Sequence, residues 1–184
     1  MSNCTASSNT GDGIEVGTQS AVTSCSVRSN TLNGITTAHV CIVSACTSES
    51  NTVDGFALGS STSISGCVAQ SNSGDGIVIA ANSFVARCIA ANNTANGIVI
   101  SAGTSVLENN CRFDGNGGDG AGILVTSGDN RIEGNNISNC DRGIDVDLGG
   151  NLIIRNSATG NGINYDIVAD NRYGPIVNIT ALGT

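Results

Sequence analysis

The chain has 184 residues, including 25 Gly, eight Cys and only five Phe or Tyr, and it carries 15 acidic residues against seven basic ones. Its formal net charge of −8 argues against nucleic acid or an anionic membrane as a partner, because both bind basic surfaces. No apolar run reaches the roughly 20 residues that a membrane span needs, so the sequence predicts no membrane insertion.

One motif recurs every 21 residues along most of the chain. The spacing is kept by a column of Asn and by a column of Cys five positions earlier: Asn9, Asn30, Asn51, Asn72 and Asn93, and Cys4, Cys25, Cys46, Cys67 and Cys88. After small insertions the columns continue as Cys111 with Asn116, Asn135 with Cys140, and Asn156 with Asn161, which makes eight copies. Such a fixed period predicts a solenoid.

Each copy holds three short apolar runs. In the first, apolar and outward positions alternate after a Gly, as in residues 76–79, and this period of two is typical of a strand. The second column reads Val22, Val43, Ile64, Val85, Val106, Ile132 and Ile153, and the third reads Ala6, Val27, Ser48, Ala69, Ala90, Phe113, Ile137 and Ala158. No helix of ordinary length fits between them, so we expect an all-β coil of three strands.

Successive coils are expected to stack strand on parallel strand at roughly 4.8 Å. Residues 72–79 and 131–137 carry a repeat that resembles the right-handed parallel β-helix family, the pectin-lyase-like fold. The resemblance covers about residues 3–172 and implies a right-handed, single-stranded β-helix. That family holds lyases, hydrolases, epimerases, tailspikes and repeat proteins, so the resemblance specifies the fold much better than the activity.

Residues 1–184 are expected to form a single β-helix domain, a segment of a longer parent protein or a chain whose first coil packs on another molecule. The motivation is that Cys4 enters the repeat at once, and an uncapped β-helix exposes unpaired backbone. Residues 169–184 hold the single proline, Pro175, and an apolar run, and we expect them to cap the last coil.

The cysteine column, with Cys111 as its sixth member, is interpreted as buried free thiols that fill a corner of the coil. No Cys-x-x-Cys pair suggests a metal knuckle. The asparagine column is interpreted as stacked amides that hydrogen-bond along the rod, at a bend where Asn tolerates the left-handed conformation. The Asp or Asn before the glycine in the first five copies, for example Asp12 and Asn33, favours turns over a Ca²⁺ site.

One acidic cluster is the candidate for chemistry. Asp145 and Asp147 are expected to point outward from one strand, with Asp170 of the next coil stacked beside Asp147 and with Arg142 and Arg172 flanking them. Carboxylates and a guanidinium on one sheet face are suited to acid–base or Ca²⁺ chemistry, and pectate-lyase-like enzymes place such groups there. The alternative is a solvated surface without function.

The same strand in earlier coils is expected to point an apolar column outward: Ala57, Val78, Val99 and Leu124. A stacked apolar column on a surface suggests self-association, packing on domains of the parent protein, or a flat ligand-binding face.

The leading functional hypothesis is a non-catalytic repeat module without a cofactor, acting as a rigid scaffold or as a carbohydrate- or protein-binding segment of a larger bacterial protein. The alternative is a polysaccharide lyase or epimerase-like enzyme with its site at Asp145, Asp147, Asp170 and Arg172, and only this alternative would use Ca²⁺. Short insertions between Gly97 and Gly122 leave little chain for a substrate groove, which favours the first hypothesis.

Overall fold

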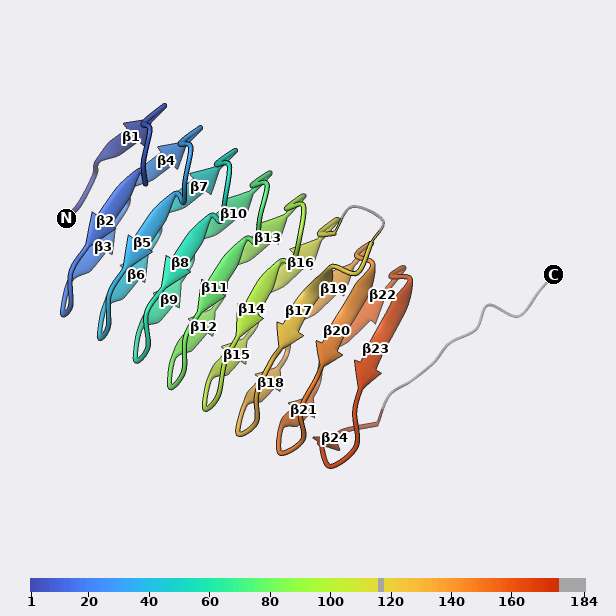
Figure 1. Cartoon of the computed structure of the whole chain (residues 1–184). Helices are drawn as coiled ribbons and strands as arrows, with labels where there is room; N and C mark the ends of the chain where they lie inside the picture. Colours follow the sequence, from blue (N-terminus) through green and yellow to red (C-terminus); the bar gives the residue numbers. More distant parts are fainter. Residues whose placement is uncertain (116–117, 176–184) are drawn as a thin grey trace.

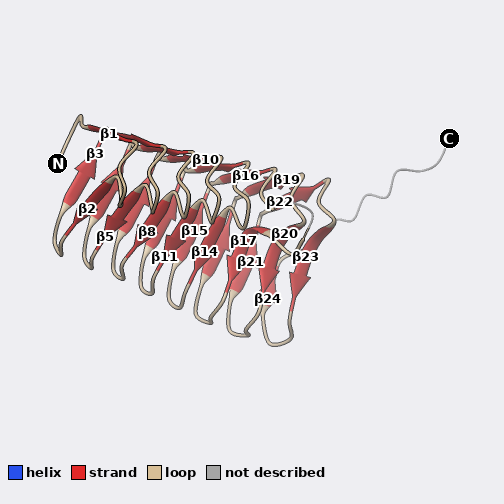
Figure 2. Cartoon of the chain, turned by 45° about the horizontal axis from the view of Figure 1, so that its top comes forward, coloured by secondary structure: helices blue, strands red, loops and turns tan. Residues whose placement is uncertain are grey.

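The computed structural model describes residues 1–115 and 118–175, which form one rod of stacked coils (Figure 1). Each coil contributes three short strands joined by turns, and no helix occurs among these residues. Strands of successive coils pair in parallel and build three eight-stranded sheets that run along the rod (Figure 2). The expected all-β solenoid of eight coils with three strands each is therefore confirmed.

The three sheets are named here by their first strand. Sheet 1 contains β1 (Thr5–Ser7), β4 (Ser26–Arg28), β7 (Thr47–Glu49), β10 (Val68–Gln70), β13 (Ile89–Ala91), β16 (Asn110–Arg112), β19 (Asn136–Ser138) and β22 (Ser157–Thr159). Sheet 2 contains β2 (Ile14–Val16), β5 (Ile35–Thr37), β8 (Phe56–Leu58), β11 (Ile77–Ile79), β14 (Ile98–Ile100), β17 (Ala121–Val125), β20 (Arg142–Val146) and β23 (Ile163–Ile167). Sheet 3 contains β3 (Ala21–Thr23), β6 (Ile42–Ser44), β9 (Ser63–Ser65), β12 (Phe84–Ala86), β15 (Ser105–Leu107), β18 (Arg131–Glu133), β21 (Leu152–Ile154) and β24 (Arg172–Tyr173).

The core is a column of inward-facing side chains from all three sheets. Ile77 and Ile98 are register partners in β11 and β14, and both are 0% exposed. Val85 of sheet 3 and Ala69 of sheet 1 are also 0% exposed, so each coil closes around a narrow apolar interior. Burial of one Ile or Val contributes about 1.5 to 3 kcal/mol, and repetition over the coils makes this the main stabilising term.

A glycine precedes the core residue of sheet 2 because no side chain fits there. A Cβ on Gly76 would lie 2.5 Å from the carbonyl oxygen of Gly97 and 2.7 Å from Nδ2 of Asn93. The next coil therefore approaches too closely for any other residue, and the Gly of the repeat has a packing role in addition to its turn role.

The asparagine ladder connects successive coils. The backbone N–H and Nδ2 of Asn51 both donate to Oδ1 of Asn72, each at 3.0 Å, and Asn72 repeats the pattern on Asn93. The bend itself is made by the residue before the ladder position, such as Ser71 with φ 56°. The expectation that Asn takes the left-handed conformation is therefore corrected, since Asn72 supplies hydrogen bonds and Ser71 supplies the bend.

The cysteine column follows the same geometry. The backbone N–H of Cys25 donates to Sγ of Cys46, and that of Cys46 to Sγ of Cys67, each at 3.4 Å. All eight cysteines of the chain are free thiols, and all except the half-buried Cys4 are buried. The prediction of buried free thiols is confirmed in the structure.

The sixth coil departs from the register that the sequence suggested. The backbone N–H of Cys88 donates to Oδ1 of Asn109 at 2.9 Å, so Asn109 continues the cysteine column. Cys111 instead pairs with Ala90 in sheet 1 and faces the core. Phe113, expected at that core position, is 52% exposed and lies at a corner with φ 54°.

This correction has a simple cause. The sixth coil keeps the 21-residue spacing from Cys88 to Asn109, and the insertion comes later, so that Asn109 and Asn135 are 26 residues apart. Asp114 therefore takes the ladder position that follows Asn93. Asn116, which the sequence suggested for it, lies outside the described residues.

A third column of polar side chains lies at the corner before sheet 3. The backbone N–H of each member donates to the side-chain oxygen of the next, as from Thr62 to Ser83 at 3.2 Å and from Asn130 to Asn151 at 2.9 Å. This column is not apparent in the sequence, because its residue type changes between Thr, Ser and Asn. Polar ladders thus occur at all three corners of the coil.

The repeat continues further toward the C-terminus than expected. β24 pairs with β21, and the backbone N–H of Asn151 donates to Oδ1 of Asn171 at 2.9 Å. The segment from Ala169 to Gly174 is thus part of a coil, although the sequence assigned it to a cap. The remaining part of that assignment, residues 176–184, lies outside the described residues.

Candidate functional site

The outward column of sheet 2 joins the two surface features that the sequence singled out. Its register runs through Ala57, Val78, Val99, Leu124, Asp145 and Asp166. We call Ala57, Val78, Val99 and Leu124 the apolar strip, and all four are half-buried. Their expected outward orientation is confirmed, whereas their role as an interface stays a prediction.

Arg142 lies beside the end of the apolar strip and contacts three carboxylates, which together with it are called the arginine cluster. Its guanidinium lies 2.6 Å from Asp145, 2.7 Å from Asp119 and 3.5 Å from Asp166. Arg142 and Asp145 belong to β20, Asp166 belongs to β23, and Asp119 belongs to the insertion before β17. The insertion therefore reaches the candidate site through one ion pair.

Asp145 is the most buried carboxylate of this cluster. Asp145 is 5% exposed. Burial raises the pKa of its carboxyl group, and the hydrogen bond from Arg142 opposes this shift. In turn, Asp145 raises the pKa of Arg142. The pair is thus a positioned structural contact, whereas the neighbouring Asp147 is exposed.

Asp141 holds the part of the insertion that precedes β17. The backbone N–H groups of Gly118 and Gly120 both donate to Oδ2 of Asp141, at 3.0 and 3.3 Å. These bonds place Asp119 over the start of β20, where it meets Arg142. A short insertion therefore contributes one carboxylate, that of Asp119, to the arginine cluster.

The prediction that Asp170 stacks beside Asp147 is wrong. Asp145 pairs with Asp166 in the register of β20 and β23, while Asp170 lies at the next corner, where its carbonyl oxygen accepts from the backbone N–H of Gly150 at 2.8 Å. Arg172 lies on sheet 3, where it pairs with Leu152. The four candidate catalytic residues are therefore divided between two places.

The second place is a depression over the corner between sheets 2 and 3, with a volume of about 510 Å³. We call it the C-terminal depression, and its lining is Asp129, Asn130, Arg131, Gly150, Asn151, Leu152, Asp170 and Arg172. Its middle coil contributes Gly150 and Leu152 where the flanking coils contribute Asp and Arg. The depression forms because the middle coil lacks these long charged side chains. The charged groups of the two flanking coils lie on either side of it.

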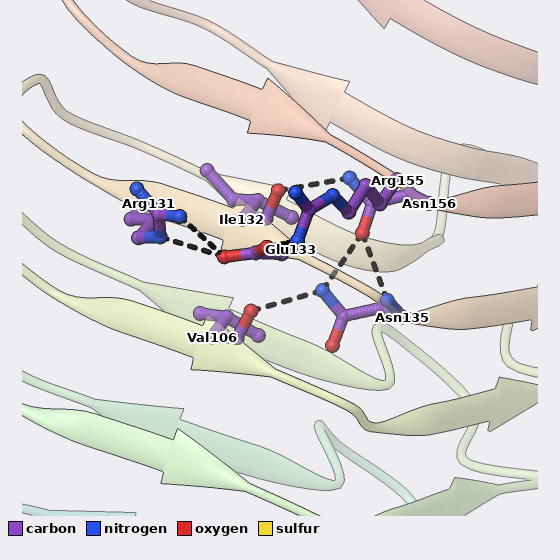
Figure 3. A network of polar contacts seen from close by, with 7 residues as sticks. All are labelled: Val106, Arg131, Ile132, Glu133, Asn135, Arg155 and Asn156. Atoms are coloured by element: carbon purple, nitrogen blue, oxygen red, sulfur yellow. Dashed lines mark hydrogen bonds and ion pairs between the residues drawn. The ribbon is translucent and has the colours of Figure 1, made fainter. Parts of the chain in front are cut away.

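The two arginines of the depression differ in their surroundings. Arg131 is held by Glu133 at 2.6 Å, and Arg155 contacts the same carboxylate at 2.9 Å (Figure 3). Beside Arg155, Oδ1 of Asn156 accepts from the backbone N–H and from Nδ2 of Asn135, in the column that continues from Cys88 and Asn109 (Figure 3). Within the described part of the chain, Arg172 has no ion pair, whereas Arg131 is paired with Glu133.

The Asp and Asn residues before the glycines act as acceptors between turns. The backbone N–H of Asn33 donates to Oδ1 of Asp12 at 2.9 Å, and that of Asp75 donates to Oδ1 of Asp54 at 2.8 Å. These bonds support the turn interpretation.

No group of three or more His, Cys, Asp or Glu suited to a metal ion occurs among the described residues. No helix long and apolar enough to cross a membrane was found in the same part of the chain.

Asp166, Asp119, Asp129 and Arg131 are site residues that sequence reasoning missed. A signal existed for Asp166, because it follows Asp145 by the 21 residues of the repeat. Asp119 had no such signal, because it lies in the insertion, where the period is broken. Asp129 and Arg131 are recognised only when the corner of the depression is seen in three dimensions.

Comparison with known proteins places the fold. The family model of the right-handed β-helix region matches residues 35–178, so the chain belongs to this family. Its coils are accordingly those of a right-handed parallel β-helix, as the resemblance in the sequence implied. A search of curated protein sequences gave no match.

Two solved structures from Azotobacter vinelandii are similar in fold. The A-module of the mannuronan C-5 epimerase AlgE4 matches with a TM-score of 0.82 at 17% sequence identity, over 96% of this chain and 57% of that module. The A-module of the mannuronan C-5 epimerase AlgE6 matches with a TM-score of 0.59 at 14% identity, over 85% of this chain and 58% of that module. The present chain thus spans less than two thirds of either structure, and identities this low establish the fold alone.

Proposed function

We propose that this chain is a non-catalytic β-helix module that binds polysaccharide in the C-terminal depression and serves as a rigid support within a larger protein. The carbohydrate assignment is supported by the likeness in fold to two modules that are named as mannuronan epimerases. The position of the site is supported by the charged and amide side chains that surround Leu152.

One observation carries the non-catalytic part of the proposal. Asp145, the acid central to the alternative enzyme hypothesis, is 5% exposed and accepts a hydrogen bond of 2.6 Å from Arg142. A general acid or base must reach a substrate proton at about 3 Å or through one water. A carboxylate beneath a guanidinium that contacts two further acids is poorly placed for this task.

The depression offers the chemistry that sugar hydroxyls require. Asp129 and Asp170 accept hydrogen bonds, Arg172 donates them, and Leu152 provides an apolar surface for the C–H face of a pyranose. Its volume of about 510 Å³ lies within the roughly 300 to 1,000 Å³ of ordinary ligand sites. The net charge of −8 opposes a polyanion, so mannuronan should bind only when Ca²⁺ is present, whereas a neutral glycan needs no cation.

Calorimetric titration with a neutral glucan and with mannuronan, each with and without Ca²⁺, tests the proposal. The double variant Asp170→Asn/Arg172→Gln should bind at least about tenfold more weakly, the loss of roughly one charged hydrogen bond. Arg87→Gln is the matched control, because Arg87 is a surface residue that pairs with Glu108 away from the depression. Absence of binding to every polymer, or equal loss in the control, would contradict the proposal.

A second candidate function, a polysaccharide lyase or epimerase-like enzyme, is favoured by one observation. Burial raises the pKa of Asp145, while Asp147 on the same side of the strand is exposed. Two carboxylates in different environments are typical of an acid–base pair.

An assay for lyase products tests this alternative, because β-elimination creates an unsaturated uronide that absorbs in the ultraviolet. We expect no such product from pectate or mannuronan, with or without Ca²⁺, and sustained turnover that is lost in Asp147→Asn would replace the non-catalytic proposal.

A further inference from the structure

Asp114 occupies a position at which the preceding coils all carry asparagine. Its Oδ1 accepts from the backbone N–H of Asn93 at 3.0 Å and from Nδ2 of Asn93 at 2.9 Å, as every ladder amide oxygen does. Asp114 is 1% exposed. Half of its carboxyl group therefore reproduces the ladder geometry of an asparagine.

The other oxygen lies where an asparagine has its NH₂ group. A Cβ built on Gly97 would lie 2.6 Å from Oδ2 of Asp114, and one built on Gly76 would lie 2.7 Å from Nδ2 of Asn93. Nδ2 of Asn93 donates to the carbonyl of Ala69, 24 residues earlier, at 3.3 Å. The same offset of 24 residues, counted back from Asp114, reaches Ala90, so the carbonyl of Ala90 is the expected neighbour of Oδ2. An ionised Oδ2 would face this acceptor without any donor, and Oδ2 is in fact a buried atom without a hydrogen-bond partner.

Among the residues that the structure describes, no charged group close to Asp114 compensates for its ionisation. Arg112, on the same coil, lowers the pKa of Asp114 only as a minor influence and is itself exposed. On the following coil the neighbours are the thiol of Cys140 and then Asp141, and within the core the neighbour is the thiol of Cys111. Burial is the largest influence and raises the pKa of Asp114 to about 6.

We propose that Asp114 is held as a neutral carboxylic acid whose proton bonds the carbonyl of Ala90, and that the stacking of the sixth coil on the fifth weakens as this proton is lost toward neutral pH. Asp114 is thus a pH-dependent contact in an otherwise neutral ladder.

The direction of the pH dependence follows from linkage. An unfolded Asp has a pKa of about 3.9, and the folded value is raised to about 6. The contribution of the neutral acid is complete below the unfolded pKa, decreases as the pH rises from about 4 to about 6, and is absent above that range. Two pKa units correspond to roughly a hundredfold change in the unfolding equilibrium constant.

The variant Asp114→Asn tests this inference, because an amide restores the donor at all pH values. Urea unfolding from pH 4 to pH 7.5 should show the unfolding constant of the parent rising by roughly a hundredfold relative to that of the variant, with the variant more stable at pH 7.5. Asp12→Asn is the matched control, since it makes the same change in an early turn and leaves Asp114 in place. Curves for Asp114→Asn and the parent that stay parallel over the whole pH range would overturn the proposal.

A second measurement uses the unaltered protein and so does not depend on the folding of the variant. The carboxyl ¹³C resonance of Asp114 should titrate well above the usual range for an aspartate, and the amide exchange of Asn93 should accelerate over the same pH interval, because that N–H donates to Asp114. Titration of this resonance near pH 4 would overturn the proposal. So would hydrogen-exchange protection of the Asn93 amide that stays constant over that pH interval.

Discussion

Ile98 and Val99 are adjacent in β14 but lie on opposite sides of sheet 2. Ile98 pairs with Ile77 in the core and is 0% exposed, whereas Val99 pairs with Val78 on the outward face and is half-buried. A shift of one residue in the register would exchange these two environments. The contrast between the two positions is therefore the most direct test of the fold.

We expect Ile98→Asp to destabilise the protein by more than about 4 kcal/mol, because it places an unpaired carboxylate in an apolar column. Val99→Asp should change the free energy of unfolding by about 1 kcal/mol or less, since water reaches the outward face. Urea unfolding followed by circular dichroism measures both. If the aspartate at position 99 proves the more damaging one, the register described for sheet 2 is wrong.

The cysteines should react only when the protein unfolds. Burial raises the pKa of the Cys25 and Cys111 thiols, whereas the hydrogen bond with Cys67 lowers the pKa of the Cys46 thiol to about 6. The protection is therefore steric, because all the cysteines except Cys4 are buried and a reagent does not reach them in the folded rod. Titration with a thiol reagent should therefore detect few groups in the native protein and nearly all eight cysteines in denaturant. A mass of the unreduced protein that is lower by pairs of hydrogen atoms would instead reveal disulfides.

Truncation of one ladder amide should be costly. Asn72 accepts two hydrogen bonds from Asn51 and donates to Asn93 and to the carbonyl of Ser48. Asn72→Ala leaves several of these buried groups without partners, at about 1 to 3 kcal/mol each, so a loss of more than about 3 kcal/mol is expected. Thermal and urea unfolding measure it.

Asn110→Ala serves as the control for this prediction, because Asn110 is an exposed residue of β16 outside the ladder. Its free energy of unfolding should stay within about 0.5 kcal/mol of the parent value. Equal effects of the two substitutions would mean that the ladder adds little to the stability of the rod.

The repeat made most of the fold predictable. Inward and outward positions alternate with a period of two in the regular coils, and the 21-residue spacing states which residues of successive coils meet. Both signals depend only on local side-chain direction and on a constant coil length. The core position of Ile98, the asparagine ladder and the outward apolar strip were therefore predicted correctly from the sequence.

The sixth coil was predicted incorrectly because a period does not state where an insertion begins. Cys111 and Phe113 were assigned two residues out of place, although the hydrogen bond from Cys88 to Asn109 keeps the regular spacing up to that point. Cys111 lies only two residues beyond the position that continues the cysteine column. Its residue type therefore suggested the wrong member, whereas Asn109 holds the position. Inter-coil hydrogen bonds, which the spacing does not encode, decide the register after any irregularity.

The candidate site shows the same division. The chain alone determined that Asp145 lies outward on a strand of the last coils, because alternation and the period reach that far. The tertiary structure alone decided that Asp145 meets Arg142, Asp119 and Asp166, and that Asp170 and Arg172 line a separate depression. Corners and insertions turn side chains by amounts that differ from coil to coil, so the neighbours of a charged residue follow from the folded backbone, whereas its inward or outward direction follows from the sequence.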